Sequence, residues 1–180
     1  MPENDYSKDI KQAIMNFAGS CSDKYYSKVL EGKIWLQAPY SRTAFYKFPY
    51  KPEVRLTEKN GEEEHHTIFE VFDSQLKDPN LIIADIIQSI LVENTKVVIF
   101  IVPSDVWEEK VKELSRVIPA ILFDKLEEAI PPSVSEKTTK KIIEDYKIPP
   151  IFVYKISLPE SKNPQKLQAL FKSWSKRDGW

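Results

Sequence analysis

The dipeptide Asn60-Gly61 is the feature that most constrains how this chain folds. Asparagine and glycine readily take the two positive-φ positions of a type I′ turn, which joins antiparallel strands through a two-residue loop. With this turn, the pairing register places Glu53 opposite Ile68. We therefore predict an antiparallel hairpin over about residues 51–72.

Side chains alternate between the two faces of such a hairpin. The face predicted to belong to the core carries Val54, Leu56, Phe69 and Val71. The other face is mostly charged and carries Lys51, Glu53, Arg55, His66, Glu70 and Phe72. On that face Lys51 is expected across from Glu70, while Glu53 and Glu70 are diagonal neighbours about 7–8 Å apart at the backbone. Two carboxylates at this spacing can reach one divalent cation.

A helix and a buried strand are predicted after the hairpin. Asp78-Pro79 supplies an N-cap residue and a proline at the first helical position, and the helix runs to about Glu93. Asn94 suits the left-handed position at its end. Residues 96–102 are almost all apolar and β-branched, which is typical of a strand covered on both faces. We expect this strand to lie parallel to the second hairpin strand, through a right-handed crossover.

Apolar periodicity and breaks at glycine and proline predict eight further elements. They are helices over residues 5–18, 23–30, 104–117, 136–146 and 164–174, and strands over residues 33–37, 120–123 and 151–158. Ser104 is the expected N-cap of its helix. The prediction is a single α/β domain over residues 1–180, with a mixed central sheet flanked by helices. Its core spans about residues 21–117, and the strand and helix of residues 150–175 dock on it.

Composition limits the partners of the chain. The 180 residues are 42% hydrophobic and 29% charged, and the net charge of −1 gives no overall field that attracts nucleic acid or membrane. Cys21 is the only cysteine, so an intramolecular disulfide and a cysteine zinc cluster are excluded, which suits a reducing compartment. No stretch reaches the roughly 20 apolar residues of a membrane span, and the first residues contain no apolar signal core. We expect a cytoplasmic protein without membrane contact.

Residues 33–52 contain no acidic side chain, while basic residues alternate with aromatic ones. Rings that stack on bases, mixed with cations that contact phosphates, are typical of a nucleic-acid surface. The side chains predicted to bind nucleic acid are Arg42, Tyr46, Lys47 and Arg55. The alternative is a pair of strands with aromatic core residues and lysine stems lying along the surface.

The order helix, strand, charged hairpin, helix, buried strand, helix over about residues 21–117 resembles the PD-(D/E)XK nuclease superfamily, which has the restriction-endonuclease-like fold (α-β-β-β-α-β). In that family an acid on one hairpin strand and the acid of an E-x-K motif on the next bind Mg²⁺, and the lysine orients or activates water. Pro52-Glu53 stands where the family has P-D, and residues 70–72 stand where it has E-x-K. The resemblance implies that Glu53 and Glu70 are catalytic metal ligands, with Glu31 in the place of a further acid.

Phe72 occupies the place of the motif lysine. Some members of the family move that lysine, and Lys51 and Lys77 are the two candidates here. The expected function is a DNA nuclease, or nuclease-like protein, that hydrolyses phosphodiester bonds with Mg²⁺ or Mn²⁺. A hard cation suits this reaction because it neutralises charge on the phosphate and lowers the pKa of bound water. Nucleases that cut both strands are often dimers, so a homodimer is also considered.

The alternative function is a catalytically inactive nuclease-like module that holds nucleic acid or a protein partner. Its surface would be the sheet or the C-terminal helix of residues 164–174, whose apolar stripe either docks on the core or binds the partner.

Overall fold

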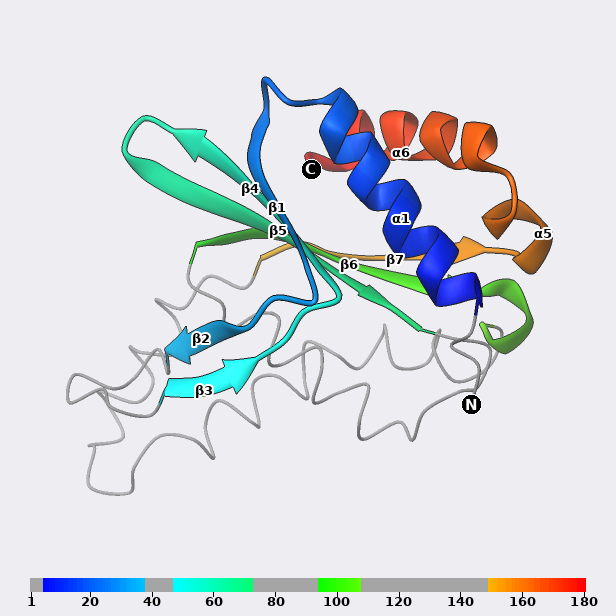
Figure 1. Ribbon diagram of the computed structural model, residues 1–180, viewed down its shortest axis with the longest axis horizontal. Helices are drawn as coiled ribbons and strands as arrows, with labels where there is room; N and C mark the ends of the chain where they lie inside the picture. Colours follow the sequence, from blue (N-terminus) through cyan, green and yellow to red (C-terminus); the bar gives the residue numbers. More distant parts are fainter. Residues whose placement is uncertain (1–4, 38–46, 73–93, 108–148) are drawn as a thin grey trace.

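The computed structural model describes residues 5–37, 47–72, 94–107 and 149–180. They form a mixed α/β structure in which helices lie on one face of a five-stranded sheet (Figure 1). The helices are α1 (Asp5–Ser20), η1 (Ser104–Val106), α5 (Leu158–Ser161) and α6 (Pro164–Asp178). The strands of the large sheet are β1 (Tyr25–Leu30), β4 (Val54–Asn60), β5 (Glu63–Val71), β6 (Thr95–Pro103) and β7 (Ile151–Ile156). A separate two-stranded sheet contains β2 (Ile34–Gln37) and β3 (Lys47–Tyr50).

The large sheet is mixed, with the strand order β1-β4-β5-β6-β7. β1 with β4 and β4 with β5 are antiparallel, while β5 with β6 and β6 with β7 are parallel. The predicted mixed sheet is therefore confirmed, including the antiparallel hairpin and the parallel strand that follows it. Asn94 precedes β6 with a φ of 59°, which confirms the left-handed position expected there.

The turn of the hairpin differs from the prediction. Asn60 pairs with Glu63, so the loop is Gly61-Glu62, and Gly61 alone has a positive φ, of 68°. One positive φ at the first loop position is the pattern of a type II′ turn, whereas type I′ needs two. The predicted turn type is therefore wrong. The loop lies one position later than predicted, and this moves each cross-strand partner by two residues.

A shift of two residues leaves every side chain on its predicted face. Val54 now pairs with Phe69 instead of Thr67, and both Val54 and Phe69 belong to the core that packs against the helices. The predicted pairs Glu53 with Ile68 and Lys51 with Glu70 do not form, because Ile68 pairs with Arg55.

The core between the helices and the sheet confirms the apolar stripes of both long helices. Phe17 of α1 and Phe171 of α6 meet Trp180, whose side chain is fully buried. Trp180 also packs edge-on against Phe69 of β5, with 5.1 Å between ring centroids. Since Leu167 and Phe171 are buried, the stripe considered for partner binding on the C-terminal helix packs in the core of its own chain.

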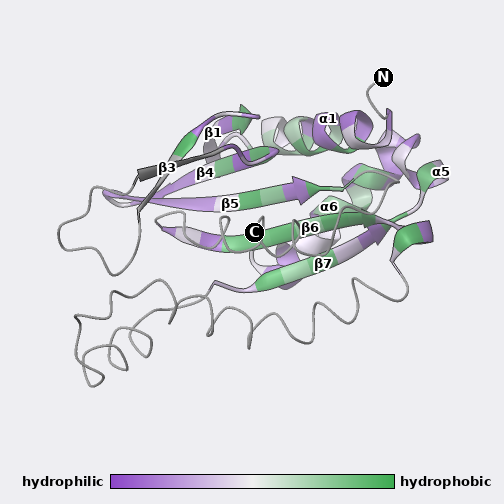
Figure 2. Cartoon of the chain, turned by 90° about the horizontal axis from the view of Figure 1, so that it is seen from below, coloured by the Kyte–Doolittle hydropathy of each residue, from purple (hydrophilic) through white to green (hydrophobic). Residues whose placement is uncertain are grey.

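The sheet face that points away from α1 is less polar than predicted. In β5 it carries Ile68 and Glu70, both buried, and Phe72 just beyond the strand stacks on Phe100 of β6 with centroids 5.7 Å apart. A strand with parallel neighbours on both sides is normally covered on both faces, and Val97 to Pro103 of β6 are all buried. Figure 2 shows that the middle of β6 is hydrophobic, whereas the turn end of the hairpin is hydrophilic.

Two of three local predictions are wrong. Residues 23–30 were expected to be helical, but residues 25–30 form β1, because Tyr25, Tyr26 and Val29 favour a strand and β4 supplies its pairing partner. The predicted strand of residues 33–37 is confirmed as β2, which pairs with β3 in the small sheet. Ser104 was expected to be an N-cap, but it is the first residue of η1, whose N-cap position is Pro103 and has no side-chain cap hydrogen bond.

Other predicted features lie outside the described residues. They are the helix of residues 78–93, the helix of residues 108–117 beyond η1, the strand of residues 120–123, the helix of residues 136–146, and the side chains of Arg42, Tyr46 and Lys77. Within the described part of the chain, no helix is long and apolar enough to cross a membrane.

Candidate functional site

Two of the predicted site residues meet where β1 ends and β4 begins. Leu30 is the last residue of β1 and pairs with Val54, the first residue of β4. The backbone N–H of Glu31 then donates a hydrogen bond of 2.9 Å to the carbonyl of Glu53. Glu31 has a φ of 48°, which turns the chain out of the sheet toward β2. Glu31 and Glu53 are therefore neighbours just beyond the paired strands.

Lys11 of α1 joins these two glutamates, and sequence reasoning missed it. Its Nζ lies 2.7 Å from Oε1 of Glu31 and 3.1 Å from Oε2 of Glu53. Its side chain is only 8% exposed, although lysine is seldom buried without a partner. The one available signal was that Lys11 follows Ile10 at the border of the apolar stripe of α1. We call Lys11, Glu31 and Glu53 the lysine–glutamate cluster.

Lys11 and Glu31 stabilise each other's charged forms. Burial alone would lower the pKa of Lys11, but hydrogen bonds and charge attraction from both glutamates outweigh it and raise the pKa above its ordinary value. The hydrogen bond and charge of Lys11 lower the pKa of Glu31, and the nearby charge of Lys51 adds a smaller effect. One buried ammonium thus compensates two carboxylates that would otherwise repel each other.

Glu70 occupies the same end of the sheet but faces a different direction. The pair Val54 with Phe69 makes Glu53 and Glu70 the next residues along the two strands. Phe69 and Val71 point into the core beneath the helices, so Glu70 between them points to the opposite face, where it is 6% exposed. Glu53 lies in the bend before β4, outside the strict alternation of a strand, and its carboxylate reaches Lys11.

The carboxylates of the cluster are chemically suited to a hard cation, but the cluster offers few ligands. Carboxylate oxygens are suitable ligands for Mg²⁺ and Mn²⁺, and Glu31 and Glu53 already hold a positive group between them. Within the residues that the structure describes, however, no three His, Cys, Asp or Glu side chains gather closely enough to hold a metal ion. Glu31 and Glu53 are the residues that would bind one, and the predicted third ligand, Glu70, is not gathered with them.

The other predicted residues that the structure describes lie around the cluster or apart from it. Lys51 is exposed in the segment before β4, close enough to Glu31 to affect its pKa. Arg55 lies on the sheet face away from α1, and in the described part of the structure its buried Nε has no hydrogen-bond partner. Lys47 begins β3, in the small sheet.

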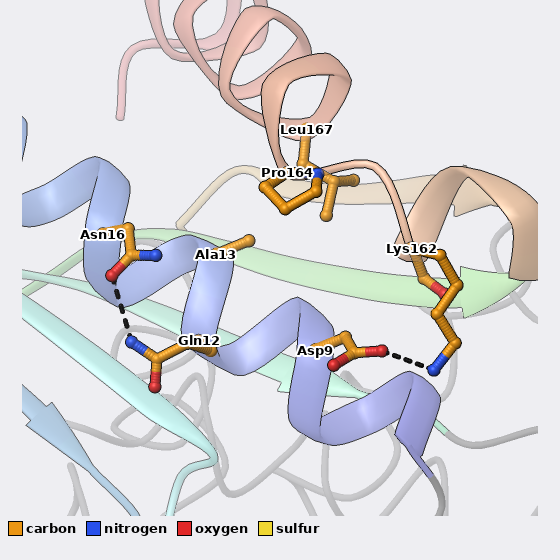
Figure 3. A pocket seen from close by; sticks show the side chains of 8 residues that line it. Asp9, Gln12, Ala13, Asn16, Lys162, Pro164 and Leu167 are labelled. Carbon is orange, nitrogen blue, oxygen red and sulfur yellow. Dashed lines mark hydrogen bonds and ion pairs between the residues drawn. The ribbon is translucent and has the colours of Figure 1, made fainter.

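A pocket of about 280 Å³ lies elsewhere, between α1 and the start of α6 (Figure 3). Its lining consists of Asp9, Gln12, Ala13, Asn16, Ser161, Lys162, Pro164 and Leu167. The two charged side chains of this lining pair with each other, with Lys162 Nζ 2.7 Å from Asp9 Oδ2. At 3.6 residues per helical turn, Lys11 points to roughly the opposite side of α1. The pocket is therefore separate from the lysine–glutamate cluster, and the two charged side chains of the pocket already pair with each other.

Comparison of the chain with protein-family models, with curated proteins and with solved structures found no match.

Proposed function

We propose that this protein is a metal-dependent nuclease or nuclease-like protein of the PD-(D/E)XK type, acting on phosphodiester bonds of DNA. The observation that carries the proposal is that Glu53, which stands in the place of the P-D acid, already shares a buried cation with a second carboxylate, Glu31. The antiparallel hairpin followed by a parallel buried strand also agrees with the order of elements in that family.

In this proposal each residue has a limited role. Glu53 and Glu31 bind the cation at the start of β4, and Glu70 approaches the same end of the hairpin from β5. A bound Mg²⁺ or Mn²⁺ neutralises charge on the phosphate and lowers the pKa of water. In the metal-free protein, Lys11 holds both carboxylates in place.

Two observations favour the alternative, an inactive module that keeps the fold. Phe72 stands in the lysine place and is stacked on Phe100, so that position is filled by apolar packing. In addition, the ammonium of Lys11 already compensates the two carboxylates without any metal. A module of this kind would bind nucleic acid or a protein without cutting.

Metal binding and cleavage test the proposal together. The experiment is calorimetric titration with Mn²⁺ and incubation of plasmid DNA with Mg²⁺, using the native protein, Glu53→Gln and Glu70→Gln. Both substitutions should abolish cleavage, and Glu53→Gln should also abolish metal binding. Glu63→Gln is the matched control, because Glu63 is an exposed carboxylate at the other end of the same hairpin. A folded native protein that neither binds Mn²⁺ nor nicks DNA rules out the enzyme.

The inactive module is tested by the salt dependence of DNA binding. If the basic residues of the 33–52 stretch contact phosphates, affinity should fall steeply with salt, and Arg42→Ala with Lys47→Ala should reduce the slope by roughly 2. If the dependence of affinity on salt is unchanged, the basic and aromatic residues of this stretch serve packing and do not contact phosphates.

A further inference from the structure

The ammonium of Lys11 lies where a bound cation would lie between two carboxylates. Glu31 Oε1, just after β1, and Glu53 Oε2, just before β4, lie 2.7 Å and 3.1 Å from it. Of the three side chains the positive one is the most buried, at 8% exposed against 44% for Glu31 and 26% for Glu53. The ammonium thus reaches the carboxylates from inside the protein, while both carboxylates remain open to solvent.

This arrangement has a consequence for ions in solution. Two carboxylates close together attract a divalent cation, but here one positive charge is already in contact with both. A cation that arrives from the solvent side is repelled by this ammonium and finds the carboxylates partly neutralised. The helix cannot withdraw the ammonium easily, because Ile10 and Ile14 on either side of Lys11 are fully buried.

We propose that Lys11 is the resident cation of a site formed by Glu31 and Glu53, and that Mn²⁺ or Mg²⁺ binds these carboxylates only in competition with it. Lys11 then sets the affinity of the site for divalent cations. This inference deepens the proposed function and rests on it for the choice of cation, but it requires neither Glu70 nor cleavage.

Replacement of Lys11 by a neutral residue of similar length tests the competition directly. Mn²⁺ is titrated into the native protein, Lys11→Met, and the double variant Lys11→Met with Glu31→Gln. Lys11→Met should bind Mn²⁺ about tenfold more tightly than the native protein, or better, and the double variant should lose this gain. Lys162→Met is the matched control, since Lys162 also pairs with a carboxylate of α1, but outside the cluster, and it should bind Mn²⁺ as the native protein does.

The test holds even if Lys11→Met does not fold without metal. Mn²⁺ should then restore the circular dichroism and the cooperative melting of the native protein, because it replaces the missing counter-charge. The inference is overturned if folded Lys11→Met binds Mn²⁺ no more tightly than the native protein, if an unfolded variant is not rescued, or if the gain survives Glu31→Gln. Tight binding by Lys11→Met beside an inert native protein supports the inference and refutes the nuclease. Cleavage by the native protein, with no gain in Mn²⁺ affinity on Lys11→Met, refutes the inference and supports the nuclease.

Discussion

The two ends of the β4–β5 hairpin both carry carboxylates but hold them in different ways. At the turn end, Glu63 is 78% exposed and lies 3.6 Å from the imidazole of His65. At the base of the hairpin, which we define as Glu53 and residues 70–72, the carboxylate of Glu53 is bonded to the buried ammonium of Lys11 and Glu70 is almost fully buried.

The difference teaches that residue type alone does not mark a site. An exposed ion pair contributes about 0–1 kcal/mol, because water and salt screen it and two side chains must be ordered. A buried charge needs a partner, and loss of that partner leaves an uncompensated charge. Carboxylates at the base are therefore committed to specific neighbours, while those at the turn are mainly solvated.

The largest expected effect tests whether the base is part of the core. Phe72→Ala should lower the free energy of unfolding by about 3–5 kcal/mol, because it removes a buried ring stacked on Phe100 and leaves a cavity. Urea denaturation followed by circular dichroism measures this. Phe72→Leu is the control and should lose much less. A loss below about 1 kcal/mol for the alanine variant would show that the base is loosely packed.

A smaller effect compares a lysine that contacts the base of the hairpin with a lysine beside its turn. Lys11→Met should lower the free energy of unfolding by about 2 kcal/mol in metal-free buffer, less than for a fully buried pair because Glu31 and Glu53 are partly hydrated. The matched change Lys59→Met, beside the turn, should stay within about 0.5 kcal/mol of the native protein. Equal losses for the two variants would erase the distinction between base and turn.

The third comparison concerns single carboxylates. Glu53→Gln should cost about 1 kcal/mol in metal-free thermal or urea unfolding, since Lys11 keeps Glu31 as a partner. Glu63→Gln should have no measurable effect. A metal-free protein that gains stability on Glu53→Gln would instead mean that repulsion between the carboxylates outweighs their bonds to Lys11.

The smallest effect extends the comparison to a carboxylate outside the hairpin. The backbone N–H of Ser157 donates a hydrogen bond to Glu160 in the capping box of α5, and this bond is the main reason why the pKa of Glu160 lies below its ordinary value of 4.5. Because the folded pKa is depressed, the stabilisation is complete above about pH 4.5 and disappears as pH falls through the folded pKa.

Glu160→Gln should therefore cost about 0.5 kcal/mol at pH 7 and nothing at pH 2, measured by urea denaturation at the two values. A cost that does not change with pH would mean that the shape of the Glu160 side chain, and not its charge, stabilises the cap.

Short-range patterns predicted much of this fold. The apolar spacing in α1, the alternation of Val54, Leu56, Phe69 and Val71, and the continuous apolar run of β6 each specify a face or a burial state locally. The prediction failed where the deciding partner is distant. β1 is a strand because β4, distant in the sequence, pairs with it, and local spacing does not show that partner.

The amino-acid sequence by itself determined the hairpin, the faces of its strands and the parallel buried strand, because side-chain alternation and burial of an apolar run depend on neighbouring residues. Only the tertiary structure decided the register of the hairpin and the surroundings of its glutamates. Lys11 lies 20 residues before Glu31 in the chain, and no local spacing links the two. They meet because packing of α1 on the sheet buries the lysine stem, and a buried ammonium must find carboxylates within reach.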